Sequence, residues 1–193
     1  MEPTITRDRW ETDVPNYRRA YCEGASYFFT VVTCQRYPIF RNDDAVHLLQ
    51  SCLRPVMYTH PFTLDAMVVL PDHLHCIWSL PSADRDFSTR WKQVKAQFTH
   101  RDLGEKAETI SGSMHRKGEK GVWQRRFWEH LIRDQDDFNA HCDYIHYNPV
   151  KHGLVRSPSD WKHSTFRSLA EEGMYPADWG QDVSLHILVM DLE

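Results

Sequence analysis

The distribution of hydrophobic and polar residues along this chain predicts four strands. Residues 27–33 combine aromatic and β-branched side chains, which favour extended backbone. Residues 62–70 have the same character, and a Pro-Asp turn leads from them directly into a third strand over residues 73–80. Residues 127–133 predict the fourth strand. The second and third strands are therefore expected to form a hairpin.

A different hydrophobic spacing between these strands predicts helices. Residues 43–58 look helical, although Pro55 stands near the end of that segment. Residues 86–103 have the period of an amphipathic helix. Its recurring apolar residues are Phe87, Trp91, Val94 and Phe98. A further helix is expected after Asp134, whose side chain can cap it, whereas the charged, glycine-punctuated residues 104–121 predict a loop.

The order strand–helix–strand, repeated once, is that of the split βαβ or ferredoxin-like plan. The predicted fold class is therefore α+β, an antiparallel sheet with one layer of helices and an extra C-terminal helix. The face of the sheet without helices is left to bind something or to be covered by another element. At 193 residues the chain is expected to be a single domain, with residues 17–155 as its core and 156–193 as a C-terminal extension.

The third strand sorts its side chains onto two faces. One set consists of Leu74, Cys76, Trp78 and Leu80, and the other of His73, His75, Ile77 and Ser79. If the first set packs on a core, His73 and His75 share the opposite face, about 6.5–7 Å apart along the strand. Two imidazoles presented in this way can hold one divalent ion, each at about 2.0–2.2 Å. A His-x-His strand is more often an ordinary polar face, so the spacing alone leaves both interpretations open.

A polar stripe is expected on the last helix. Its members follow the spacing i, i+4, i+7, i+11, i+14, and are Asp137, His141, Tyr144, Asn148 and Lys151. The stripe is expected about a third of a turn from the buried face formed by Phe138, Cys142 and Ile145. Pro149 is expected to end or kink the helix, so that Asn148 would reach a metal from an irregular turn. A tyrosine, an amide and a lysine thus converge where they could face the histidine strand.

Composition and charge narrow the function classes. The chain is 41% hydrophobic and 26% charged, and no apolar run of about eighteen residues predicts a membrane span. Its polar, acidic start predicts no secretory signal, and five cysteines without a C-x-x-C pair predict reduced thiols in a cytoplasmic protein. Residues 85–126 hold eleven Lys or Arg and five acidic residues, a net charge of +6, whereas the whole chain carries −4. This segment is a candidate for binding nucleic acid, although a solvated charged loop explains it equally well.

Three blocks of the sequence resemble a known family. They are residues 69–78 (VLPDHLHCIW), 123–130 (WQRRFWEH) and 143–153 (DYIHYNPVKHG). Together they closely resemble the REP-associated tyrosine transposases, bacterial single-tyrosine relatives of the His-hydrophobe-His transposases. The resemblance runs from about residue 17 to residue 179. Two departures are a loop at 104–121 that looks longer than the family usually shows, and Arg125 where proline is common.

The resemblance implies a role for each residue of the candidate site. It implies that His73 and His75 are the histidine pair, that Asn148 takes the place of the third metal ligand, and that Tyr144 is the nucleophile. It also implies a nuclease and strand transferase that cleaves single-stranded DNA near the foot of REP-type palindromic hairpins and keeps the 5′ phosphate on the tyrosine. The mixed N and O ligand set suits Mg²⁺ or Mn²⁺. The expected protein is a nucleoid-associated monomer or homodimer with no membrane partner.

Basic residues are expected to contact DNA phosphates or bases, and the candidates are Arg18, Arg19, Arg90, Lys92, Lys95, Arg125, Arg126 and Lys151. Two other functions stay open. One is a non-catalytic hairpin-binding protein on the same fold. The other is a zinc hydrolase that adds His141, Cys142 and His146 to the histidine pair, although no recognised zinc spacing is present. Tyr147 is the rival nucleophile, about 100° further round the helix.

Overall fold

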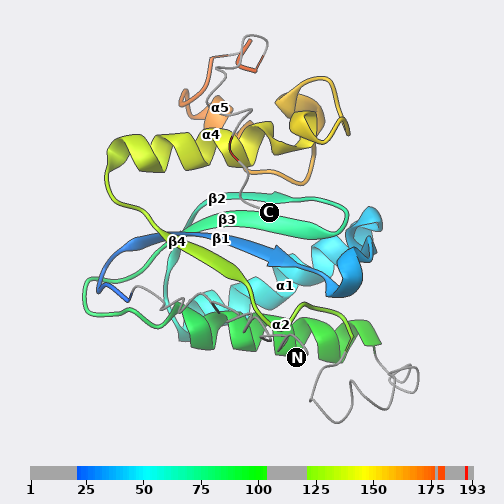
Figure 1. Cartoon of the computed structure of the whole chain (residues 1–193), viewed down its shortest axis with the longest axis vertical. Coiled ribbons are helices and arrows are strands. Elements are labelled where there is room, and N and C mark those ends of the chain that lie inside the picture. The colour runs from blue at the N-terminus through cyan, green and yellow to red at the C-terminus, as the bar shows by residue number, and fades with distance from the viewer. Residues whose placement is uncertain (1–20, 104–120, 177, 181–189, 191–193) are drawn as a thin grey trace, which may run out of the picture.

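The computed structural model describes residues 21–103, 121–176, 178–180 and 190 (Figure 1). Four strands form one antiparallel sheet in the order β2-β3-β1-β4, and they are β1 (Ser26–Val32), β2 (Thr63–Val69), β3 (His73–Ser79) and β4 (Trp128–Leu131). The helices are α1 (Asp43–Thr59), α2 (Phe87–Leu103), α4 (Gln135–Lys151) and α5 (Phe166–Glu171), with 3-10 turns η1 (Cys34–Arg36), η2 (Ile39–Arg41) and η4 (Pro158–Asp160). The predicted α+β, ferredoxin-like order of strands and helices is confirmed.

The sheet lies between two layers of helices (Figure 1). α1 and α2 cover one face, and α4 runs across the other. The face that carries the two histidines, which the sequence left without an assigned cover, is therefore closed by the extra helix. No helix in the described part of the chain has the length and hydropathy needed to cross a membrane.

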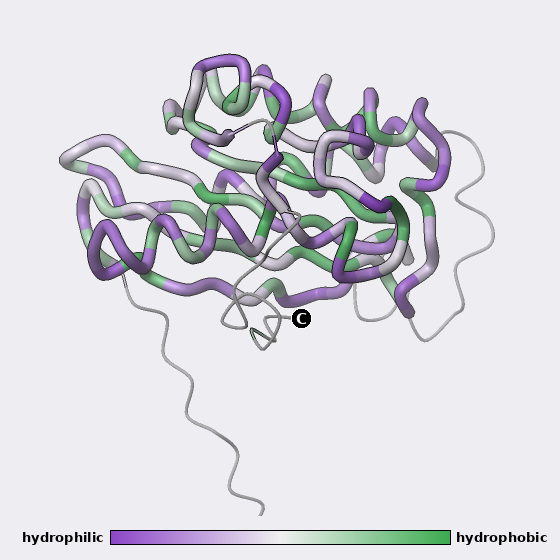
Figure 2. The backbone as a smooth tube through the Cα atoms, turned by 90° about the horizontal axis from the view of Figure 1, so that it is seen from above, coloured by the Kyte–Doolittle hydropathy of each residue, from purple (hydrophilic) through white to green (hydrophobic). Residues whose placement is uncertain are grey.

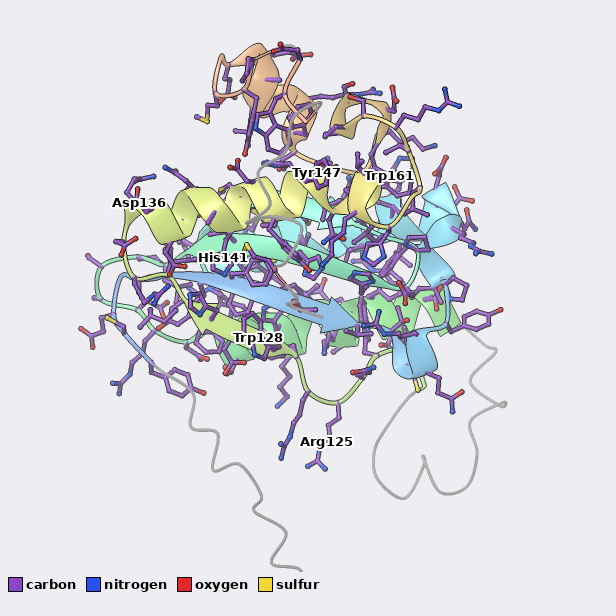
Figure 3. All side chains as sticks on the ribbon, turned by 45° about the horizontal axis from the view of Figure 1, so that its top comes forward. Arg125, Trp128, Asp136, His141, Tyr147 and Trp161 are labelled. Atoms are coloured by element: carbon purple, nitrogen blue, oxygen red, sulfur yellow. The ribbon has the colours of Figure 1, made fainter. Side chains whose placement is uncertain are left out.

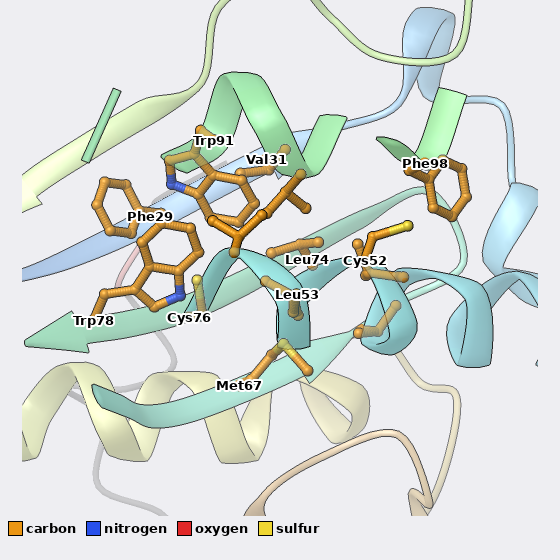
Figure 4. Close-up of a cluster of buried hydrophobic side chains, with 14 of the residues drawn as sticks. Phe29, Val31, Cys52, Leu53, Met67, Leu74, Cys76, Trp78, Trp91 and Phe98 are labelled. Carbon is orange, nitrogen blue, oxygen red and sulfur yellow. The ribbon is translucent and has the colours of Figure 1, made fainter. Parts of the chain in front are cut away.

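The larger hydrophobic core fills the space between the sheet and the helices α1 and α2 (Figure 4). β3 contributes Leu74, Cys76 and Trp78 to this core, as its alternation predicts. The indole of Trp78 stacks on that of Trp91 in α2, with ring centroids 4.1 Å apart and an interplanar angle of 15°. Hydrophobic and hydrophilic positions follow one another along the helices (Figure 2), and the apolar residues of α1 and α2 are the ones that enter this core.

A second, smaller core joins α4 to the opposite face of the sheet. It includes Phe28 of β1 and Ile77 of β3, packed with Tyr144 and Ile145 of α4. The polar stripe of α4 was expected beside the buried face of the helix, but it is part of that buried face. The first four residues of the stripe are all buried: Asp137, His141, Tyr144 and Asn148. α4 is thus buried over a wider sector than its apolar residues alone predict.

α4 begins as predicted and ends later than predicted. The side chain of Asp134 accepts a hydrogen bond from the backbone N–H of Asp137 at 2.8 Å, which is the expected N-cap. The prediction that the helix ends at Pro149 is wrong, because α4 continues to Lys151. Pro149 lies in the last turn, where the missing N–H removes only one helical hydrogen bond. Asn148 therefore stands on regular helix.

The chain leaves α4 through a left-handed glycine. Gly153 has φ of 66°, and its N–H donates to the carbonyl of Val150 at 2.9 Å. The N–H of Leu154 donates to the carbonyl of Pro149, also at 2.9 Å. This pair of bonds is a Schellman motif, which satisfies the last carbonyls of the helix and turns the chain away from it.

Residues after the Schellman turn pack on β2 and on α4. The N–H of Val69, on the outer edge of β2, donates to the carbonyl of His163 at 2.9 Å. The buried imidazole of His146 contacts Tyr175 Oη through Nδ1 at 2.8 Å and Thr165 Oγ1 through Nε2 at 2.9 Å. Burial lowers the pKa of His146 to about 3, so this imidazole is neutral. The contacts protect the edge of β2 and anchor α4 from its outer side.

Arg90 serves the fold and not a DNA surface. Its side chain is only 1% exposed. Nη2 donates to Asp84 Oδ2 and to the carbonyl of Pro61, both at 2.7 Å. Nη1 donates to the carbonyl of Asp86 at 2.7 Å, and Nε donates to that of His60 at 3.1 Å. The expectation that Arg90 contacts DNA does not hold, because each guanidinium nitrogen is committed within the protein.

We expect Arg90→Ala to lower the free energy of unfolding by about 2–3 kcal/mol, because it leaves buried carbonyl oxygens without a donor. The carboxylate of Asp84 keeps one-third of its surface exposed, so water recovers part of the loss there. Urea denaturation measures the change. Lys92→Ala, an exposed site on the same helix, is the control and should change stability by less than about 0.5 kcal/mol. Equal stability of the two variants would contradict the structural role of Arg90.

Candidate active site

His73 and His75 stand next to each other on β3, on the sheet face that α4 covers. Their ring centroids are 4.9 Å apart, and both side chains are buried. Nδ1 of His73 lies 2.6 Å from Asp72 Oδ1, and Nδ1 of His75 lies 2.9 Å from Thr30 Oγ1. With each Nδ1 hydrogen donated to these oxygens, the lone pair that a metal ligand needs is on Nε2. Within the described residues, the buried Nε2 of His75 has no hydrogen-bond partner.

α4 brings Tyr144 and Asn148 to the same face. The ring centroid of Tyr144 lies 5.2 Å from that of His75, and both residues are fully buried. Asn148 lies one helical turn further along and is fully buried as well. Neither polar atom of its amide has a hydrogen-bond partner in the described part of the chain. An amide in this state is costly unless something binds it, which makes the space beside Asn148 a candidate ligand site.

The C-terminal end of α4 completes the site. Lys151 Nζ lies 4.9 Å from the ring centroid of Tyr144 and donates to the carbonyl of Met190 at 2.7 Å. The imidazole of His152 lies 5.4 Å from that of His73, between ring centroids. A cationic side chain and a third imidazole therefore border the tyrosine and the histidine pair. The side chain of Tyr144 itself is fully buried.

The residues present fit a divalent metal ion. The histidine pair offers two imidazole nitrogens, and Asn148 offers an amide oxygen, a donor set that Mg²⁺ and Mn²⁺ accept. Burial, followed by the nearby charge of His73, holds the pKa of His75 well below its usual range. His75 is therefore neutral, as a metal-binding imidazole must be. The hydrogen bonds to Nδ1 fix the orientation of both rings, which is the role of the outer partners of metal-binding histidines.

A second cluster that could hold a metal lies nearer the start of α4. The ligand atoms of His130, Asp137 and His141 all lie within 4.8 Å of one another. Arg133 also donates to Asp137 Oδ2, from its backbone N at 3.0 Å and from Nε at 3.1 Å. Burial raises the pKa of Asp137, but hydrogen bonds from Arg133 and His130 outweigh it and hold that pKa far below its usual range. An exposed guanidinium thus already pairs with the carboxylate that this cluster would offer to a cation.

The zinc-hydrolase alternative finds no support in the geometry. His146 is bonded to Tyr175 and Thr165, outside the space shared by the histidine pair. Burial raises the pKa of the Cys142 thiol to about 12, so this cysteine is protonated and a poor metal ligand. The metal-competent group found in the described residues includes His141 but neither of these two.

The rival nucleophile Tyr147 lies on the outer side of α4 (Figure 3). Its ring centroid is 6.4 Å from that of Trp179 in the C-terminal extension, with the two rings nearly perpendicular. Tyr144 instead packs against Phe28 and His75 on the sheet side. Of the two tyrosines, Tyr144 is the one that α4 places beside the histidines.

Of the predicted basic residues that the structure describes, Lys151 alone lies at this site. Lys92 and Lys95 stand on α2, across the sheet from α4, and Lys95 Nζ donates to the carbonyl of Gln124 at 3.0 Å. Arg125 and Arg126 are exposed in the segment before β4, and Arg125 points outward from the fold (Figure 3). The two remaining candidates, Arg18 and Arg19, lie outside the described residues.

Sequence reasoning missed the residues that hold the histidine rings. Asp72 looked like a turn residue, although an acidic residue directly before the His-x-His pair was a usable signal. Thr30 carries no signal of its own, since only the strand register sets it opposite His75. Partners across a sheet follow from the pairing of strands, and the pairing is not visible in one sequence.

Both the sequence and the fold of this chain are similar to those of known proteins. A REP-associated tyrosine transposase of Escherichia coli K12 is 44% identical over 168 residues, which cover 87% of this chain and 92% of that protein. A Haemophilus influenzae protein assigned to the same family is 40% identical over 172 residues, 89% of this chain and 97% of the relative. A solved structure of a REP-associated tyrosine transposase bound to a REP hairpin matches with a TM-score of 0.72 and 43% identity, over 87% of this chain and 92% of that one. No protein-family model matches the chain.

The similarity extends over nearly the whole length of these relatives, and it holds for both the sequence and the fold. Together they define the class of protein as a DNA transposase of the tyrosine type. More particularly, the chain belongs to the family of REP-associated tyrosine transposases.

Proposed function

We propose that this protein is a metal-dependent endonuclease and strand transferase that acts on single-stranded DNA at REP-type palindromic hairpins through a 5′-phosphotyrosine intermediate. One observation carries the proposal. The buried ring of Tyr144 has its centroid 5.2 Å from that of His75, beside the amide of Asn148, which has no hydrogen-bond partner among the described residues. The hairpin substrate rests on the family, since a member 43% identical to this chain has been solved with a REP hairpin bound.

Tyr144 is the nucleophile in this proposal. Its hydroxyl oxygen attacks the scissile phosphorus, so that an Oη–P bond forms and the P–O3′ bond breaks. The phenol gives up its proton, and the departing 3′ oxygen takes one up to leave as a hydroxyl. The strand stays attached to the protein through its 5′ phosphate, and attack by another 3′ hydroxyl reverses the step and transfers the strand. Lys151, whose ammonium group already lies over the ring, balances charge on a phosphate oxygen.

His73, His75 and Asn148 would hold the divalent ion, Mg²⁺ or Mn²⁺. When bound, such an ion supplies Lewis-acid polarisation of a phosphate and neutralises charge on a leaving oxygen. Asp72 and Thr30 keep the two imidazoles in the orientation and tautomer that this role requires.

Contacts with the rest of the DNA are assigned to basic side chains outside the catalytic centre. The members of this set are Arg18, Arg19, Lys92, Lys95, Arg125 and Arg126, whereas Lys151 belongs to the centre itself. Trp128 adds an aromatic surface, since it is 38% exposed and its ring lies 5.8 Å from that of Phe28, on the sheet face that bears the histidines. An exposed indole at this place suits stacking with an unpaired base.

The proposal is tested by incubating the full chain with a labelled single-stranded REP-type hairpin that carries its flanking strand. We expect a labelled protein band that survives denaturation, together with a shortened DNA product. The same DNA as a full duplex, and a hairpin with a scrambled stem, are the controls and should give neither. Hairpin binding without any adduct, under conditions that supply Mg²⁺ or Mn²⁺, would leave the non-catalytic alternative as the better account.

Neutralising Lys92 and Lys95 together should weaken hairpin binding and flatten its dependence on salt. Removal of one ion pair with a DNA phosphate lowers the log–log slope by about 0.7–0.9. A binding titration at several salt concentrations measures that slope. The control replaces Arg54, an exposed residue of α1, with alanine. It removes one positive charge elsewhere in the layer formed by α1 and α2. An unchanged slope in the double variant would remove α2 from the DNA-binding surface.

A further inference from the structure

A cavity of 290 Å³ opens beside His73, and the proposed chemistry assigns no ligand to it. Its walls come from the β1–α1 connection, the β2–β3 turn and the end of α4. They include Arg36, Arg41, His73 and His152. The volume is near the lower end of the range for small-ligand pockets, about 300 Å³. The cavity therefore has room for one small group next to the histidine pair.

The charged groups of this cavity favour an anion. Among the described residues of the lining, Asp72 is the single carboxylate, and it is already shared between Arg36 and His73. Arg36 Nη1 lies 3.2 Å from Asp72 Oδ2, and His73 Nδ1 lies 2.6 Å from the other oxygen. The guanidinium of Arg41, which is exposed, is thus an additional positive charge at the mouth of the cavity. Arginine matches the geometry of phosphate oxygens better than lysine does, through two parallel hydrogen bonds.

The backbone that carries the two arginines is held in an unusual conformation. Gln35 and Arg36 both have positive φ, 54° and 52°, although neither is glycine. Thr33 Oγ1 donates to the carbonyl of Tyr37 at 2.8 Å, and the N–H of Phe40 donates to the carbonyl of Pro71 at 2.9 Å. The first bond closes the connection on itself, and the second ties it to the turn that precedes His73. Consecutive left-handed residues persist only where the surroundings enforce them, and here they keep an arginine at the cavity.

We infer that this cavity is a phosphate subsite, in which Arg41 and Arg36 bind a phosphodiester of the single-stranded DNA next to the scissile one. The inference rests on the proposed function, because the DNA strand is the substrate assigned there. It goes further by naming residues that hold a flanking phosphate and so fix where the strand enters beside His73. Arg41 is the better probe, since replacing Arg36 would also disturb the carboxylate that orients His73.

The test measures binding in the full chain carrying Tyr144→Phe, so that cleavage plays no part. A series of fluorescent hairpins has one neutral methylphosphonate linkage at successive positions in the single-stranded flank. With Arg41 present, one or two positions should weaken binding about tenfold, the loss expected for one charged hydrogen-bonded contact. In Arg41→Ala the same substitutions should change affinity by only about threefold or less, because Arg36 alone is left to sense the charge.

Arg54→Ala is the matched control, since it removes an exposed arginine on the far side of the sheet. It should keep the sensitive positions. An interference pattern that is the same in Arg41→Ala and Arg54→Ala overturns the subsite. Covalent adduct formation is scored separately with the Tyr144 protein. A missing adduct would count against the proposed catalysis alone, because the binding pattern still decides the subsite.

Discussion

Tyr144→Phe is expected to abolish DNA cleavage and the covalent protein–DNA adduct while leaving hairpin affinity within about twofold. The change removes the oxygen that is proposed to form the bond to phosphorus, and loss of a nucleophile costs roughly 10⁴-fold or more in rate. The phenyl ring keeps its contacts with Phe28 and His75, so the fold and the DNA surface stay intact. A labelled hairpin assay for the adduct, paired with a binding titration, measures both quantities.

The matched control for this prediction is Tyr147→Phe. Tyr147 differs from Tyr144 by less than one helical turn but packs against Trp179 on the outer side of α4. Its hydroxyl should be dispensable for cleavage. If Tyr147→Phe were inactive and Tyr144→Phe active, the assignment of the nucleophile would be wrong, and α4 would have to rotate before it acts.

Much of the fold follows from local patterns in the sequence. In β3 the period of two separates Leu74 and Trp78 from His73 and His75, and the structure places the first pair in the larger core. The side chain of Asp134 caps α4 as its residue type indicates. These predictions succeed because each depends on geometry over a few residues.

Other features depend on contacts that one sequence does not display. The burial of the polar stripe of α4 follows from the docking of that helix on the sheet, which turns Tyr144 and Asn148 inward with the apolar residues. Arg90 has the charge of a DNA contact, yet backbone carbonyls far from it in sequence occupy its guanidinium. Pro149 shows that a helix breaker costs little in a last turn closed by Gly153.

The residues of the candidate site also fall into two groups, those that the sequence predicts and those that only the fold reveals. The histidine pair, the tyrosine and the asparagine are visible as motifs, and the fold brings them to one buried face. Thr30 and Arg41 are not visible, because each joins the site through the pairing or turning of the chain. Residues that support a site are often recognisable only from their position around it.

His75→Ala should eliminate cleavage and also the binding of the metal, and excess EDTA should do the same to the unchanged protein. The Nε2 atom of His75 is buried and has no hydrogen-bond partner among the described residues, so it contributes little to the stability of the fold. The effect of His75→Ala on activity should therefore come mainly from loss of the metal ion. The expected loss of activity is at least about 10³-fold, because Lewis-acid stabilisation of the phosphate is worth several kcal/mol. Isothermal titration with Mn²⁺ follows binding independently of activity, and circular dichroism checks the fold of the variant.

His130→Ala is the decisive control, because His130 belongs to the second cluster that could hold a metal and lies on the same face of the sheet. Its carboxylate partner Asp137 is already neutralised by Arg133, so we expect His130→Ala to keep both cleavage and Mn²⁺ binding. The opposite result, with binding lost in His130→Ala and kept in His75→Ala, would move the metal to the start of α4. Full activity of the unchanged protein in excess EDTA would remove the metal from the mechanism. Tyr144 would then have to act with the cationic groups of the site alone, of which Lys151 is the one that lies over its ring.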